Sequence, residues 1–170
     1  MSFRILGLSP EAFAPLFLLD DAALGALGVR RFVADEPHSA PCRITLEDAE
    51  PGERLLLMNH QHQPADSPFR ASGPIFVREK GTAGFDAEGI VPDALHRRML
   101  SVRAYDAQAM MVRGQLVPGA DVGALLEEWL AEPEVEEVHL HYAARGCYAA
   151  RAVRSQAASP PPAEEGKPSS

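Results

Sequence analysis

Residues 55–62 join an apolar run to a pair of histidines, Leu55-Leu56-Leu57-Met58-Asn59-His60-Gln61-His62. An unbroken apolar run of this length, in place of alternation, is typical of a strand that is covered on both faces. We therefore expect residues 55–58 to form a central strand of the sheet. Side chains two apart on a strand point to the same face, so His60 and His62 are expected to project together from the end of this strand.

A second pair of histidines, His139 and His141, has the same spacing near the other end of the chain. On a strand over 135–142, Glu137 would share their face, while the apolar residues between them would point the other way. Glu and His side chains are suitable ligands for zinc or iron. The alternative is a solvated outer face of an antiparallel sheet, on which such alternation is expected.

The two pairs can form one site only if their strands are neighbours or face each other across a cleft. Directly paired residues have Cβ atoms about 4.5–5.5 Å apart. We therefore predict that His62 lies within about 10 Å of His139 or His141, roughly twice that spacing. At least one of Arg70 and Arg103 should then open onto the same cleft. The four paired histidines are candidate metal ligands, and the sequence identifies no cofactor.

The remaining apolar periods and turn residues predict a series of short elements. Strands are expected at 3–8, 29–34, 43–46, 75–77, 100–105, 109–112, 135–142 and 147–153. A broken helix is expected over 9–27, a short one from 92, and an amphipathic one over 121–131 that buries Trp129. The glycine-containing segment 80–91 is expected to be a mobile loop. Because the strands often follow one another directly, the fold class is α+β, a largely antiparallel sheet with two or three helices.

Composition indicates one compact globular domain over 1–154 and a disordered C-terminal tail over 155–170, which is rich in Ser, Pro, Ala and Glu. The net charge of −8 repels nucleic acid and anionic membranes, so neither is an expected partner. No segment approaches the ~20 apolar residues that span a bilayer. Cys42 and Cys147 lack the spacing of a zinc ribbon or a thioredoxin motif. We expect a cytoplasmic protein with free thiols, and the oligomeric state stays open.

A rigid loop over 67–74 carries Arg70 and Ser72 between residues that restrict the backbone, and such loops often position functional groups. Four arginines, Arg70, Arg78, Arg103 and Arg113, could converge on one anionic ligand through their fork-shaped donors. The alternative is four separate surface arginines, some with acidic neighbours. Cys42 stands beside Arg43, a cation that would favour the thiolate, and is a candidate nucleophile.

Several segments together resemble a bacterial family. They are Pro41-Cys42-Arg43, Leu46-Glu47-Asp48-Ala49, Gly52-Glu53, His62-Gln63-Pro64, the stretch 67–79, Arg103-Ala104-Tyr105-Asp106, His139-Leu140-His141 and Gly146-Cys147. The family is catalogued only as domain of unknown function 1203, and the likeness covers nearly all of residues 1–154. The resemblance implies a compact single-domain protein and carries over no activity. One position departs from the pattern, because Tyr142 stands where an Asn is expected.

Two hypotheses about function follow from these residues. The first is a small-molecule binding protein or enzyme whose ligand is an anion and whose cleft is lined by His and Arg. Its catalytic candidates are His60, His62, His139, His141 and Cys42, and its ligand-binding candidates are Arg70, Ser72 and Arg103. The second is a non-catalytic interaction or structural protein, in which the same residues only solvate a sheet face. Whether the chain is an enzyme is left open by the sequence.

Overall fold

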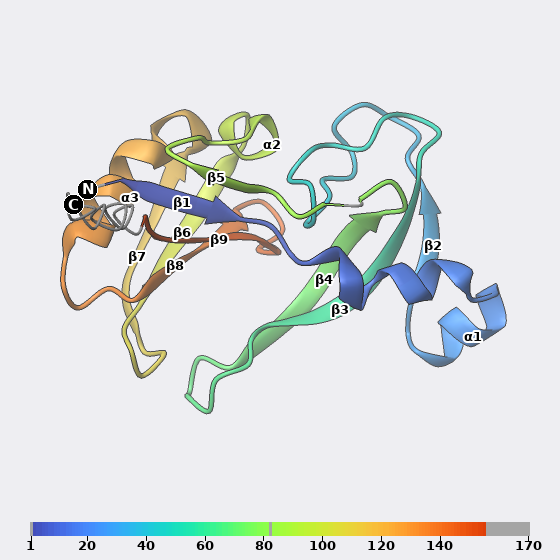
Figure 1. The fold of residues 1–170 in the computed structure, drawn as a ribbon, viewed down its shortest axis with the longest axis horizontal. Helices are drawn as coiled ribbons and strands as arrows, with labels where there is room; N and C mark the ends of the chain where they lie inside the picture. Colours follow the sequence, from blue (N-terminus) through green and yellow to red (C-terminus); the bar gives the residue numbers. More distant parts are fainter. Residues whose placement is uncertain (1, 82, 156–170) are drawn as a thin grey trace, which may run out of the picture.

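Two antiparallel sheets and a few short helices make up the computed structural model, which describes residues 2–81 and 83–155 (Figure 1). The larger sheet has the strand order β5 (Asp86–Glu88), β1 (Phe3–Leu6), β9 (Tyr148–Arg154), β8 (Glu137–Tyr142), β6 (Met99–Tyr105), β7 (Met111–Pro118). The smaller sheet has the order β2 (Arg30–Val33), β3 (Arg54–Gln63), β4 (Ala71–Arg78). The α-helices are α1 (Asp21–Ala26), α2 (Asp93–His96) and α3 (Val122–Ala131). The predicted α+β class with antiparallel pairing is confirmed, although the strands form two sheets and not one.

Helix α3 covers one face of the larger sheet and forms the main core with it. Its apolar side chains at helical spacing are buried, and Trp129 is 4% exposed. They pack on the inward residues of β6 and β8, which alternate along each strand, as Val102 and Leu140 illustrate. The helix ends at Ala131 because Glu132 already has an extended backbone and Pro133 follows. The amphipathic helix predicted from the sequence is therefore present.

The apolar run 55–58 lies in the middle strand of the smaller sheet, as expected from its unbroken pattern. β3 pairs with β2 on one edge and β4 on the other. Leu55 and Leu56 point to opposite faces, and both are almost completely buried. Leu56 and Met58 belong to a second apolar cluster, which also contains Phe13 from the N-terminal segment. The smaller sheet thus has a core of its own.

Segment 43–46 was expected to be a strand, and this prediction is wrong. The N–H of Cys42 bonds to the Glu47 carbonyl and the N–H of Leu46 to the Cys42 carbonyl, so the chain turns back on itself. Leu46 has a positive φ of 53°, which no strand residue adopts. The carbonyls of Arg43 and Ile44 accept hydrogen bonds from the N–H groups of Leu8 and Phe85, and not from a neighbouring strand of a sheet.

Two other segments differ from expectation in their local form. Part of the expected loop 80–91 is strand β5, because β1 offers it a free edge of the larger sheet. The broken helix predicted over 9–27 begins with two 3-10 segments, Pro10–Ala12 and Ala14–Leu18, before α1 starts at Asp21. The side chain of Asp20 accepts the N–H of Ala23 and so caps α1.

The predicted disordered tail lies almost wholly outside the described residues. Only Ser155 is described, and its N–H donates to the Ser2 carbonyl. The two ends of the described chain therefore meet beside the larger sheet (Figure 1). Within residues 2–81 and 83–155, no helix has the length and apolar character that crossing a membrane requires.

Trp129→Ala should lower the free energy of unfolding by about 3–5 kcal/mol, since it removes a large buried side chain from the main core. Chemical denaturation measures this loss. Leu18→Ala is the control, because Leu18 is 88% exposed and its truncation should cost less than about 0.5 kcal/mol. A loss at Trp129 below about 1 kcal/mol would contradict the packing described for α3.

Candidate functional site

The face of the larger sheet that lies opposite α3 is polar. Strand pairing places Arg103 of β6 and Arg151 of β9 on either side of His139 of β8. The next row along the sheet has His141 between Ser101 and Tyr148. His139 is 2% exposed and His141 is fully buried, so this is not a solvated outer face. The alternative interpretation, in which His139 and His141 lie on a solvated outer face, is therefore wrong.

Strand β3 covers this polar face and brings the two histidine pairs together. The ring centroid of His62 lies 5.0 Å from that of His141 and 6.3 Å from that of His139. The His62 ring also stacks on Tyr148, with centroids 5.3 Å apart and planes 10° apart. His60 lies farther out on β3, 6.3 Å from Tyr148 between ring centroids. The predicted proximity of the two pairs is confirmed.

Irregularities of strand pairing coincide with this cluster. The β3–β4 ladder shifts register between His60 and Gln63, which is where His62 stands. The β8–β9 ladder shifts between Leu140 and His141, and the β6–β7 ladder shifts between Ala104 and Tyr105. The ring of Tyr105 lies 4.8 Å from that of His139. Bulges re-aim side chains and are over-represented beside active sites, so their coincidence here marks a built site.

Hydrogen bonds to the protein fix the tautomers of two of the histidines. Nε2 of His139 lies 2.9 Å from a carboxylate oxygen of Glu137, and Nδ1 of His141 lies 3.0 Å from the carbonyl oxygen of Gly146. Both oxygens only accept, so each of these ring nitrogens donates. In a neutral imidazole the remaining nitrogen, Nδ1 of His139 or Nε2 of His141, carries a lone pair. In a typical general base, a carboxylate accepts a hydrogen bond from one ring nitrogen of a histidine, and the other ring nitrogen keeps its lone pair.

These nitrogens have no partner in the part of the chain that the structure describes. Among the described residues, nine buried side-chain nitrogen or oxygen atoms lack a hydrogen-bond partner, and five of them belong to this cluster. They are Nδ1 and Nε2 of His62, Nε2 of Gln63, Nδ1 of His139 and Nε2 of His141. A buried polar atom without a partner costs about 1–3 kcal/mol. Their concentration at one place points to a bound polar group.

The electrostatics of the cluster favour neutral imidazoles at His62 and His141. Burial lowers the pKa of His62 to about 4 and that of His141 to about 3, and the nearby charge of Arg103 contributes to both shifts. Burial also lowers the pKa of His60. The hydrogen bond from His139 lowers the pKa of Glu137, so this carboxylate is ionised at neutral pH. The neutral imidazoles of His62 and His141 can accept a hydrogen bond from a bound group.

A cleft of about 660 Å³ opens beside the cluster. β3 residues from His60 to Ala65 form one wall, Leu6–Ser9 form another, and Glu137, His139, Tyr148 and Arg151 complete the lining. One terminal nitrogen of the Arg151 guanidinium lies 3.4 Å from a carboxylate oxygen of Glu137, and the Arg151 side chain remains 47% exposed. The arginine of this cleft is thus Arg151. Neither Arg70 nor Arg103 is part of the lining, so the prediction that one of them opens onto the cleft is wrong.

The other candidate residues lie apart from the cleft. Arg70 donates to the carbonyls of Pro64 and Ala65 and so closes the β3–β4 turn. Ser72 is exposed on β4, opposite the bulge. Cys42 is completely buried in the core of the smaller sheet, where no substrate reaches it.

The four arginines do not converge, and the alternative of separate arginines with acidic neighbours holds for Arg78 and Arg113. Arg78 pairs with Glu47 and Glu53, and Arg113 pairs with Glu134. Arg103 has no carboxylate partner among the described residues and stays beside the histidines.

The geometry argues against a metal ion in the cluster. No group of three or more His, Cys, Asp or Glu side chains in the described ranges 2–81 and 83–155 is placed to hold one. Zinc lies only about 2.0–2.1 Å from each ligand nitrogen and would hold three ring centroids about 5 Å apart. The centroids of His139 and His141 are 6.4 Å apart and those of His62 and His139 are 6.3 Å apart. This spacing suits a hydrogen-bonded oxygen or nitrogen, which lies about 2.8–2.9 Å from each ring nitrogen.

Sequence reasoning missed two residues of the site, Tyr148 and Arg151. Both belong to β9, which the sequence correctly predicted as a strand paired with β8. Placing them requires the register of that pair, which shifts at His141. The departure at Tyr142 does not disturb the site, because this side chain lies on the other face, with its ring against the guanidinium groups of Arg43 and Arg98.

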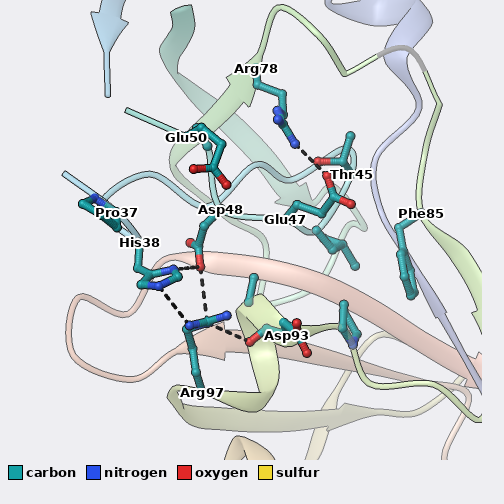
Figure 2. Close-up of a pocket in the computed structure, with 14 residues that line it drawn as sticks. Pro37, His38, Thr45, Glu47, Asp48, Glu50, Arg78, Phe85, Asp93 and Arg97 are labelled. Atoms are coloured by element: carbon teal, nitrogen blue, oxygen red, sulfur yellow. Dashed lines mark hydrogen bonds and ion pairs between the residues drawn. The ribbon is translucent and has the colours of Figure 1, made fainter. Parts of the chain in front are cut away.

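A second cleft, of about 470 Å³, lies between the loop 37–50 and helix α2 (Figure 2). Its charges are largely paired within the protein. Arg78 contacts Glu47 at 2.7 Å on one side, while Asp48 faces Arg97 and His38 on the other. Compared with the histidine cleft, it presents fewer groups that still require a partner.

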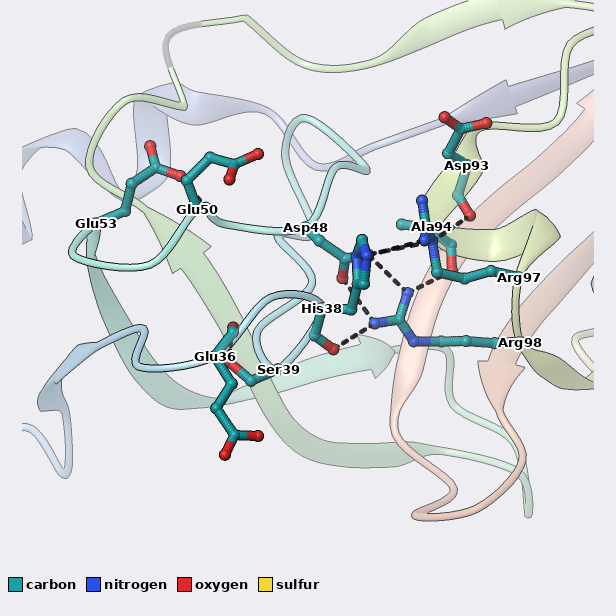
Figure 3. A network of polar contacts seen from close by, with 10 residues as sticks. All are labelled: Glu36, His38, Ser39, Asp48, Glu50, Glu53, Asp93, Ala94, Arg97 and Arg98. Atoms are coloured by element: carbon teal, nitrogen blue, oxygen red, sulfur yellow. Dashed lines mark hydrogen bonds and ion pairs between the residues drawn. The ribbon is translucent and has the colours of Figure 1, made fainter.

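Asp48 is the centre of a polar network that ties the two halves of the fold together (Figure 3). Its carboxylate, 8% exposed, accepts two bonds from Arg98, at 2.7 and 3.1 Å, and one from His38 at 3.1 Å. Arg98 also donates to the His38 carbonyl. Because Arg98 follows α2 and Asp48 lies in the loop before β3, the network is a structural clamp.

Asp48→Ala should destabilise the fold by about 3 kcal/mol, because it leaves the partly buried Arg98 without its carboxylate. Thermal or chemical denaturation measures the effect. Glu134→Ala is the control, since its contact with Arg113 is solvent-exposed and such pairs contribute little. Equal losses in the two variants would show that the network is not a clamp.

Stability should fall as the pH is lowered from about 6.5 towards 4. The folded chain keeps His62 and His141 neutral in this range, whereas the unfolded chain protonates them near their ordinary pKa of 6.5. Each proton that only the unfolded chain binds costs about 1.4 kcal/mol per pH unit. Melting temperatures of a His62→Gln, His141→Gln double variant should depend less on pH. A His96→Gln control, at an exposed residue, should keep the wild-type slope, and an unchanged slope in the double variant would contradict the assignment.

Comparison with known proteins assigns the chain to a family without assigning an activity. A family model described as "Protein of unknown function (DUF1203)" matches residues 39–154, which include the whole of β3, β8 and β9. No curated protein and no solved structure matches the chain. Since the matched residues make up more than half of the sequence, the chain belongs to the DUF1203 family.

Proposed function

We infer that this chain binds a small organic anion in the histidine-lined cleft, as a binding protein or as an enzyme. The single observation that carries this function is the row Arg103–His139–Arg151 across the larger sheet. It places one arginine on each side of a buried imidazole in the sheet. Arg151 lines the cleft and contacts Glu137, while Arg103, outside the lining, has no carboxylate partner among the described residues. Fork-shaped guanidinium donors suit carboxylate or phosphate groups.

The dimensions and composition of the cleft support the same function. A cleft of about 660 Å³ is within the usual size of small-molecule sites, which are about 300–1,000 Å³. The rings of His60 and Tyr148 give it apolar surface, and Arg151 and Glu137 give it orienting polar groups. If the protein is an enzyme, His139 held by Glu137 is the residue that would accept a proton from the ligand.

A bacterial cytoplasm is the proposed setting of this activity. Cys42 and Cys147 are not joined to each other, and one of them, Cys147, is only partly buried. Free thiols persist in reducing compartments. Small organic anions are abundant there as metabolites, which suits the proposed ligand class.

A structural role for the cluster is the second candidate, and one observation favours it. The tip of the β3–β4 hairpin is fastened to the β6–β7 turn, where Ser67 donates to the Ala109 carbonyl and the ring of Phe69 lies 6.3 Å from that of Tyr105. On this account the histidines only fill the contact between the two sheets. Ligand binding distinguishes the two candidates.

Butyrate is a suitable probe of the anion site, and its binding can be followed by amide chemical-shift titration of the full chain. Arg151→Gln should weaken binding about tenfold or more, because a charge-assisted hydrogen bond is lost. Arg113→Gln is the matched control, since Arg113 also lies on the larger sheet and contacts a carboxylate but is outside the cleft. Its affinity should equal that of the wild type. Shifts that do not map to the cleft, or equal affinities in the two variants, would favour the structural role.

A further inference from the structure

The lone pairs of the histidine cluster specify what a ligand must offer beyond its anionic group. Glu137 and Gly146 fix the tautomers so that His139 and His141 each present an acceptor nitrogen to the buried space between the sheets. Acceptor nitrogens do not bind a carboxylate or phosphate oxygen. The group that enters the cluster must therefore donate a hydrogen bond.

His62 adds one donor and one acceptor to the same cluster. Neither of its ring nitrogens has a partner among the described residues, and a neutral imidazole carries one N–H and one lone pair. His62 and His139 both line the cleft, and His62 is the one of the three that remains partly exposed. A ligand in the cleft therefore meets the cluster at these two histidines.

The charge near the cluster separates two classes of donor, the ammonium and the hydroxyl. Arg103 is aligned with His139 in the sheet and has no carboxylate partner among the described residues. Its positive charge reaches both His62 and His141 and disfavours a second cation beside them. A neutral donor is favoured, and a hydroxyl group matches it because it can donate to one imidazole and accept from the N–H of another.

We propose that the ligand is a hydroxy acid, whose anionic group is held by Arg151 while its hydroxyl enters the cluster formed by His62, His139 and His141. This inference rests on the proposed function and adds the hydroxyl to it. The 6.3 and 6.4 Å separations between ring centroids leave room for one hydrogen-bonded oxygen between the imidazoles. Without that oxygen, the buried nitrogens stay unpaired, so an analogue that lacks the hydroxyl binds more weakly.

A matched pair of probes tests the hydroxyl, namely 3-hydroxybutyrate and butyrate, which differ by this group alone. The full-length wild type should bind 3-hydroxybutyrate at least about tenfold more tightly than butyrate. Equal affinities would overturn the hydroxyl inference and leave the anion site standing. Failure of both probes to bind would overturn the proposed function as well, so the two failures are distinguishable.

Two variants on β3 test which histidine of the cleft is responsible for the preference for 3-hydroxybutyrate over butyrate. His62→Phe keeps an aromatic ring against Tyr148 but removes both ring nitrogens, so the variant should bind 3-hydroxybutyrate and butyrate equally well. His60→Phe is the control, because His60 lines the same cleft but contributes none of the unpaired nitrogens. It should retain the preference. Loss in both variants, or in neither, would contradict the role of His62.

A spectroscopic readout keeps the inference testable if His62→Phe does not fold. In ¹⁵N-labelled wild-type protein, 3-hydroxybutyrate should shift the imidazole resonances of Nδ1 of His139 and Nε2 of His141. Butyrate should leave both in place while still shifting the amides that line the cleft. Identical imidazole shifts with the two probes would show that the hydroxyl does not reach the cluster.

Discussion

The end of strand β3 that carries His62 lies against the polar face of the larger sheet, and this contact joins the two halves of the chain. Face-to-face contacts between sheets usually interdigitate apolar side chains. Here the stacked rings of His62 and Tyr148 occupy that position, with the imidazoles of His139 and His141 of β8 behind them. Such a contact retains hydrophobic area from the rings but leaves nitrogens unpaired, at a cost of about 1–3 kcal/mol for each atom. An apolar interface would be more stable, which is why we assign the cluster a function.

Arg43 connects this contact to the clamp at Asp48. Its guanidinium is buried, donates to the Tyr148 carbonyl and lies 5.0 Å from the ring centroid of Tyr142. Arg98, the main partner of Asp48, lies 5.2 Å from the centroid of the same ring. Burial lowers the pKa of Arg43, while the carbonyls and the ring partly compensate for its lost hydration. The positions of Tyr148 in the cleft and of α2 beside the loop 37–50 thus depend on one continuous set of contacts.

Local pattern was sufficient for most of the elements. The unbroken run 55–58 predicted a middle strand, and the period of α3 predicted the burial of Trp129, because each pattern records which faces of one element are covered. The two wrong predictions, at 43–46 and in the expected loop 80–91, arise where contacts with distant segments decide the local structure. Segment 43–46 is apolar enough for a strand but uses its carbonyls for bonds to Leu8 and Phe85, both remote in sequence. β5 is a strand only because β1 has an unpaired edge at that place.

The sequence alone was sufficient to identify both histidine pairs, and it predicted that the members of each pair share a strand face, since side-chain direction alternates with period two. It also placed the chain in its family by resemblance. Only the tertiary structure decided that β3 lies over β8, that Arg151 and not Arg70 belongs to the cleft, and that Cys42 is inaccessible. The physical reason is that these relations depend on register shifts at His62, His141 and Tyr105 and on packing between distant segments, neither of which leaves a period in the local sequence.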